Sequence, residues 1–179
     1  AFPYSTHDVY CRNSQNEFGT KVYEFVIDNN DSDPYTSVQY AGDNKDFKPA
    51  YMDYNTKKFN YGSWEGAFIM GLIKPCMLKT DGTVDYYLHE NDLGLKADGV
   101  TPSDNKNVNY DGNAMLQVGQ IWIKEQNVNG RKHISIANKQ VDENYDCWTH
   151  KKADGTYADY CYRALYNGSL INNKIRSLS

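Results

Sequence analysis

The chain has 179 residues, with 19 Lys and Arg against 23 Asp and Glu, so its formal net charge at pH 7 is −4. This acidic balance argues against a surface for nucleic acid or anionic membranes, because phosphate binding needs clustered Lys and Arg and the sequence has no basic stripe. A chain of this length buries one good core, or two small ones side by side.

Composition predicts a mainly β protein. The chain contains 16 tyrosines, which favour strands, and it is rich in Asn, Asp and Gly, which favour turns. The longest apolar run spans residues 67–73 and is far shorter than the roughly 20 residues of a membrane helix, so no membrane insertion is expected. We predict antiparallel hairpins that form one or two small sheets or a sandwich, with little helix.

The first half of the chain is predicted to form an arm and a small module. Residues 1–20 show no hydrophobic period and are interpreted as an N-terminal arm. Residues 21–74 are assigned to an N-terminal β module. Within it we expect a strand at 21–27 and a short strand at 38–40, and a loop or a helical turn broken by Pro49 at 46–53. Residues 67–76 fit a buried strand or a short helix that ends near Pro75.

Residues 75–179 are predicted to form a hairpin-rich β module, with one continuous domain as the alternative. Residues 77–88 and 152–162 share the pattern Lys-x-Asp-Gly-Thr followed by a Tyr-rich run, which indicates two hairpins with Asp-Gly turns. This shared pattern is short, so two independent hairpins are favoured over a duplicated domain. Between them, residues 91–109 are polar and rich in glycine, which predicts a long surface loop.

The strongest local pattern is a hairpin centred on Asn129-Gly130. Both central residues of a type I′ turn need positive φ, which Asn tolerates and Gly adopts freely. Residues 121–128 and 131–138 are therefore predicted to pair as antiparallel strands. Counting outward from the turn places Val128 opposite Arg131, Glu125 opposite Ile134, Ile123 opposite Ile136 and Trp122 opposite Ala137.

This register predicts two different faces for the hairpin. One face collects four isoleucines and is expected to meet a core, namely Ile121, Ile123, Ile134 and Ile136. The other face is expected to meet water or a partner, with Trp122 packing over Ala137. Its polar members are Lys124, Gln126, Arg131, His133 and Ser135.

Several ordered blocks of the sequence resemble a known family. They are KPCMLKTDGTVDYYLHENDLGLKADG, YDGNAML, IWIK, ISIANKQVD, ADGTYADYCY, ALYNGS and KIRSLS. Together they resemble bacteriophage virion proteins of the tail-fibre or receptor-binding type, found in phages of gut bacteria. The resemblance extends over residues 22–179 and is strongest from Lys74 onward. In longer members, similar segments lead into a C-type-lectin-like domain.

The resemblance implies a virion structural protein, that is, a fibre, decoration or adaptor subunit. Such a protein acts through contacts with other virion proteins, forms homo-oligomers, and can also attach to a glycan or receptor on the host surface. It would be located in the virion, after assembly in the bacterial cytoplasm. Longer relatives continue past the block that ends here at Ser179. We therefore expect Leu178 and its neighbours to pair with a segment absent from this sequence or with an adjacent subunit.

Cysteine and histidine suggest no cofactor or metal site. Residues 147–150 and Cys161 offer three zinc ligands, whereas a structural site wants four. A three-residue loop at Asp154-Gly155 would place Cys147 opposite Cys161 and allow a disulfide. A two-residue loop would place Trp148 opposite Cys161 instead. In the reducing cytosol that the resemblance implies, buried thiols are the favoured alternative.

Other candidate sites are weak in the sequence. Residues 28–33 place oxygen ligands at alternate positions, but the glycine and glutamate of a calcium loop are missing, so a solvated turn is favoured. No catalytic motif is found, although the separation of carboxylate pairs cannot be read from sequence. The alternative function is a glycan-binding or depolymerising enzyme of the virion. Its aromatic platforms would be Trp64, Trp148, Tyr157 and Tyr160.

Overall fold

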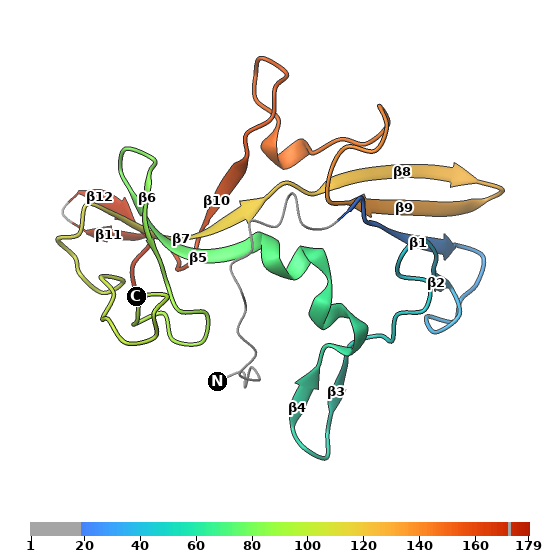
Figure 1. The fold of residues 1–179 in the computed structure, drawn as a ribbon, viewed down its shortest axis with the longest axis horizontal. Helices are drawn as coiled ribbons and strands as arrows, with labels where there is room; N and C mark the ends of the chain where they lie inside the picture. Colours follow the sequence, from blue (N-terminus) through green and yellow to red (C-terminus); the bar gives the residue numbers. More distant parts are fainter. Residues whose placement is uncertain (1–18, 172) are drawn as a thin grey trace. The chain divides into compact units, whose positions relative to one another are not determined.

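The computed structural model describes residues 19–171 and 173–179 and is mainly β (Figure 1). In this part of the chain the helical elements are short 3-10 helices, and no helix is long and apolar enough to cross a membrane. The 3-10 helices are η1 (Gly62–Gly66), η2 (Phe68–Leu72) and η3 (Trp148–His150). The strands are β1 (Val22–Asp28), β2 (Val38–Tyr40), β3 (Tyr51–Asp53), β4 (Lys58–Asn60), β5 (Ile73–Lys79), β6 (Val84–Tyr87), β7 (Gly112–Gly119), β8 (Trp122–Val128), β9 (Arg131–Ala137), β10 (Tyr160–Ala164), β11 (Ser169–Ile171) and β12 (Lys174–Arg176). The predicted fold class is confirmed.

The chain forms two compact units, each built from segments that are distant in the sequence. Unit 1 contains Leu72–Gly119 and Tyr160–Ser179, with a sheet in the order β10-β7-β5-β6 and the hairpin β11-β12. The described part of unit 2 contains residues 19–71 and Gln120–Asp159, with a sheet in the order β2-β1-β9-β8 and the hairpin β3-β4. All pairings are antiparallel. The division into segments 1–20, 21–74 and 75–179 stays a prediction, and residues 1–18 of the arm lie outside the described residues.

The β8–β9 hairpin has the predicted turn and register. Asn129 and Gly130 have φ of 51° and 79°, as a type I′ turn requires. Val128 pairs with Arg131, Ile123 with Ile136, and Trp122 with Ala137. The turn residues therefore set the pairing of the whole hairpin.

The prediction that the second face of this hairpin meets water or a partner is wrong at its Trp122 end. Trp122, Ala137 and Ser135 are buried, and Trp122 packs in a cluster with Tyr145 and Cys147. The reason is that residues 139–157 return to β8. Asp146 pairs with the edge of β8 through two main-chain hydrogen bonds to Ile123, and the neighbouring side chains of Tyr145, Cys147 and Tyr157 pack on this face.

The isoleucine face lies on a cluster of aromatic rings. Strand β1 pairs with β9 so that Tyr23 lies opposite Ile136 and Phe25 opposite Ile134, and direct cross-strand neighbours point to the same side of a sheet. The Trp64 ring stacks on Phe25 with centroids 5.9 Å apart. The four isoleucines are half-buried, so both faces of the sheet carry apolar packing.

Strand β5 continues through Pro75, so the predicted end of the element at this proline is wrong. Pro75 lies opposite Leu116 of β7, and its carbonyl accepts a hydrogen bond from Leu88 N. The register with β6 then shifts between Met77 and Leu78. Residues 68–72 before the strand form η2, so the segment 67–76 combines both predicted alternatives.

Asp-Gly turns occur three times with closely similar geometry. Gly82, Gly99 and Gly155 all have positive φ. In each turn the Asp carboxylate accepts a hydrogen bond from a main-chain N–H group, two in the case of Asp98, and a Thr hydroxyl donates to the same carboxylate at 2.6 Å. The third copy, at Asp98, lies in the segment 91–109 that was predicted to be an aperiodic loop. This segment is held by main-chain bridges at 88/96 and 95/102.

Residues 152–162 do not form the predicted hairpin with a Tyr-rich return strand. The turn at Asp154 is closed by Lys152 N donating to Thr156 O and by the bridge between Lys151 and Tyr157. The Tyr-rich residues 160–164 instead form β10, which pairs with β7. The Tyr-rich strand therefore pairs with β7, which is distant in the sequence, and not with the residues just before the Asp154 turn.

The last residues complete the core of unit 1, so the expectation that they need a partner outside this chain is wrong. Leu178 is 8% exposed and packs with Met77, Leu88 and Ala114. Ser177 O accepts a hydrogen bond from Ala114 N, and Ser177 N donates to the Asn113 side chain. Ser179 N donates to Asn105 O, so the residues after β12 bond to partners within the unit.

The Asp98 turn predicts a pH dependence of stability. Hydrogen bonds from the Thr101 hydroxyl and from two main-chain N–H groups lower the pKa of Asp98 from 3.8 to about 2. Because the folded pKa is depressed, the stabilisation is present above pH 4 and is lost as the pH falls toward 2. In thermal melts, Asp98→Asn should be less stable than wild type at pH 5, and the difference should shrink toward pH 2. A difference in melting temperature that does not vary with pH would contradict this assignment.

Candidate functional site

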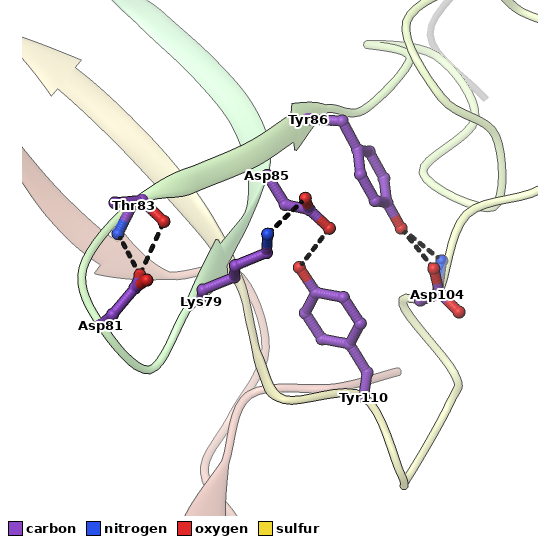
Figure 2. A network of polar contacts seen from close by, with 7 residues as sticks. All are labelled: Lys79, Asp81, Thr83, Asp85, Tyr86, Asp104 and Tyr110. Atoms are coloured by element: carbon purple, nitrogen blue, oxygen red, sulfur yellow. Dashed lines mark hydrogen bonds and ion pairs between the residues drawn. The ribbon is translucent and has the colours of Figure 1, made fainter.

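A network of polar contacts joins tyrosines and carboxylates in unit 1 (Figure 2). Strand β6 supplies Asp85 and Tyr86, whose side chains leave opposite faces because they are neighbours on a strand. Asp85 forms an ion pair with Lys79 at 3.0 Å and accepts a hydrogen bond from Tyr110 Oη at 3.1 Å. Tyr86 Oη donates to Asp104 Oδ2 at 2.9 Å and accepts from Asp104 N at 2.7 Å.

Electrostatics fix the protonation state of this network at neutral pH. The hydrogen bond from Lys79 lowers the pKa of Asp85. Burial raises the pKa of Tyr86 to about 12, and burial together with the Asp85 carboxylate also raises the pKa of Tyr110. Asp85 is thus an acceptor and the two tyrosines are donors. A general acid or base works best with a pKa near the operating pH, so the network suits structure rather than proton transfer.

The network fastens the segment 91–111 to the sheet. Besides the Tyr86–Asp104 bonds, Lys96 Nζ lies 4.3 Å from the centroid of the Tyr86 ring, within the range of a cation–π contact. Thr80 Oγ1 donates to Asp111 at 2.9 Å. These contacts explain how a polar, glycine-rich segment takes a fixed conformation.

The four predicted aromatic platforms have different surroundings in the structure. Trp64 belongs to the aromatic cluster over β1, in edge contact with Tyr23 and Phe47. Tyr157 packs on Trp122 at 4.7 Å and donates to Asp146 at 2.7 Å. Trp148 of unit 2 is 57% exposed, and Tyr160 lies on β10 of unit 1. Trp64 and Tyr157 therefore serve packing, and Trp148 presents most of its ring to solvent.

Cys147 and His150 are adjacent and buried, with Sγ and Nδ1 3.2 Å apart. Cys147 and Cys161 are not joined by a disulfide. Cys161 lies on β10 opposite Val118. Within residues 19–171 and 173–179, no group of three or more His, Cys, Asp or Glu side chains is placed to hold a metal ion. The carboxylates of residues 28–33 instead accept hydrogen bonds from main-chain N–H groups of the same loop.

A second candidate site is the aromatic hairpin, which we define as residues 51–61 and which contains β3 and β4. Its large side chains face solvent, with Tyr54 at 85% exposed and Tyr51, Met52 and Phe59 also exposed. Met52 and Phe59 form a cross-strand pair. The rings of Phe59 and Tyr61 meet edge to face, with centroids 4.9 Å apart. Contiguous exposed apolar side chains of this kind mark interaction surfaces.

The aromatic hairpin is held firmly at both ends. At the turn, Asp53 Oδ1 accepts hydrogen bonds from Asn55 N and Thr56 N. At the base, Ser63 exchanges hydrogen bonds with the main chain of Lys48. Gly62 has φ of 59°, and a Cβ there would lie 2.5 Å from Lys48 O. The apolar side chains are thus presented on a preorganised element, which lowers the entropy lost on binding.

No family model, curated protein or solved structure matches this chain. The sequence signals for the two candidate sites were also weak. The aromatic hairpin lies in a Tyr- and Phe-rich passage whose exposure cannot be read from composition. The tyrosine–carboxylate network joins β6 to residues on later loops, and no spacing rule connects them.

Proposed function

We propose that this chain is a phage virion structural protein that acts through protein contacts, with the aromatic hairpin as a principal contact element. The observation that carries the proposal is the exposed Met52–Phe59 pair on a hairpin that is fixed at its turn and base. Figure 1 shows β3 and β4 projecting from the end of the segment that follows β2. The ordered sequence blocks that resemble virion proteins support the same function.

The charge of the aromatic hairpin indicates the chemistry of its partner. The hairpin contains Lys57 and Lys58 but only one carboxylate, Asp53, which is occupied by the turn. The elements of a good interface are thus present, with apolar and aromatic groups at the centre and charge at the rim. We expect the partner to be another virion protein with an apolar groove bordered by acidic residues.

Incorporation into virions tests the proposal. Virions assembled with Met52→Ser/Phe59→Ser should contain much less of this protein than virions assembled with the wild-type chain. The matched control is Tyr35→Ser, which removes an aromatic ring that is 93% exposed outside the hairpin. Quantitative mass spectrometry of purified virions gives the readout, and circular dichroism verifies the fold of each variant. Equal incorporation of the double variant, or absence of the wild-type protein from virions, would overturn the proposal.

Glycan contact is the second candidate, because the Trp148 ring is largely exposed and aromatic faces stack on sugars. Incubating the protein with host capsule or wall glycan distinguishes the possibilities. Retention on the glycan that is lost in Trp148→Ala supports binding, and released oligosaccharide supports a depolymerase. If neither occurs and the protein is incorporated into virions, the structural function stands alone.

A further inference from the structure

Strand β8 forms one edge of the sheet in unit 2 (Figure 1). The outer edge of β8 is paired near the start of the strand, far from the Asn129-Gly130 turn. There Ile123 N donates to Asp146 O and Asp146 N donates to Ile123 O, both at 2.9 Å. This pair also shows which residues of β8 direct main-chain groups away from β9. Since the direction alternates along an antiparallel strand, Glu125 and Asn127 share the outward direction of Ile123.

The outward groups of Glu125 and Asn127 form an open stretch of sheet edge. No main-chain or side-chain partner is found for them among residues 19–171 and 173–179. Residues 125–128 are all exposed, and the pairing of β8 with β9 runs in continuous register without a bulge. Proteins usually protect such edges with prolines, bulges or covering loops. Residues 125–128 contain no proline or bulge, and no loop of the described chain bonds to their outer edge.

We propose that this edge is an interface in which β8 pairs antiparallel with β8 of a second copy of the chain, about a two-fold axis through Gln126. This register places Glu125 of one chain opposite Asn127 of the second copy, and the reverse. Both residues direct their N–H and C=O groups outward, so each symmetric pair exchanges two N–H···O bonds. The two four-stranded sheets become one continuous sheet.

Charge and turn geometry select this register over its neighbours. An axis through Glu125 would place the two Glu125 carboxylates directly opposite each other, which is destabilising. An axis through Asn127 would pair Glu125 with Asn129, whose φ of 51° belongs to the turn and cannot extend a ladder. With the axis at Gln126, Lys124 lies opposite Val128 of the second copy, and the Glu125 carboxylate is already paired with Lys132 at 2.9 Å.

Cysteine cross-linking tests the position of the axis. Gln126 would face its own copy in a non-hydrogen-bonded pair, with Cβ atoms close enough for a disulfide. Gln126→Cys should therefore give a covalent dimer on a non-reducing gel. Asn127→Cys should not, because Asn127 lies opposite Glu125 of the second copy and two residues away from its own equivalent. The wild-type chain controls for the native thiols, of which Cys76 and Cys147 are buried. Equal cross-linking of both variants would overturn the register.

Sedimentation tests the interface without a new thiol. The wild-type chain should reach a mass twice the 20.5 kDa of one chain as its concentration rises. Asn127→Pro removes only an outward N–H, which an edge strand tolerates, and should weaken dimerisation by at least about tenfold. Asn127→Ala keeps the N–H and should dimerise like wild type, and near-ultraviolet circular dichroism verifies that the proline variant is folded. A wild-type chain that stays monomeric up to its solubility limit, or a dimer unaffected by the proline, would overturn the proposal.

Discussion

Trp122→Ala should lower the free energy of unfolding of unit 2 by about 3–5 kcal/mol, the usual cost of truncating a buried aromatic side chain. Trp122 is 6% exposed and packs with Ala137, Tyr145 and Cys147, and its ring lies 4.7 Å from Tyr157. Removing the indole opens a cavity beneath the segment that folds over β8. Because Ile123 on the opposite face is only half-buried, Ile123→Ala should cost less.

The chain provides a matched control for this measurement in Trp148→Ala, because Trp148 is exposed in the same unit. The free energy of unfolding of the Trp148→Ala variant should stay within about 1 kcal/mol of that of the wild type. All three tryptophans lie in unit 2, so a denaturant melt followed by the fluorescence of the remaining tryptophans reports on that unit. Equal destabilisation by the two substitutions would show that the Trp122 face is not the packed one.

Met77→Ala should lower the stability of unit 1 by about 2–5 kcal/mol, through lost burial and the cavity that remains. Met77 is fully buried at the centre of β5 and contacts the core residues Leu88, Ala114 and Leu178. Hydrogen exchange of the amides in β5 and β7 measures the effect within the unit. Met70→Ala is the control, since Met70 is 42% exposed, and it should leave these exchange rates nearly unchanged. Slow exchange in both variants would contradict the core assignment.

The sequence predicted elements that depend on short-range turn chemistry. Asn129-Gly130 specified the β8–β9 register, because both positions need positive φ and the flanking residues then pair by counting outward. The strand at β1 and the short β2 were also predicted within one or two residues. The third Asp-Gly turn, at Asp98, was missed although it carries the same Lys-x-Asp-Gly pattern, because an extra Val100 precedes its threonine.

The sequence did not predict features that depend on long-range partners. Strand β1 pairs with β9, and β10 pairs with β7, and no local pattern encodes either choice. The buried face of β8 was misassigned because it is covered by residues 139–157, which are polar in composition. The sequence predicts that the element at 67–76 ends near Pro75, whereas β5 continues through this proline, with Leu116 opposite it on one side and Leu88 N bonded to its carbonyl on the other. The tyrosine–carboxylate network shares this limit, since it joins strand residues of β5 and β6 to residues of a later loop.

The position of Leu178 in the core of unit 1 has a consequence for how the protein is made. The other members of that core lie between residues 77 and 114, so they leave the ribosome long before Leu178 does. While residues 120–159 of unit 2 are being synthesised, the core around Met77 and Leu88 therefore still lacks Leu178. Domains that are contiguous in sequence can fold one after another during translation. Here unit 1 closes only when the last residues of this sequence arrive, and a nascent chain stalled before them would present an apolar surface to chaperones.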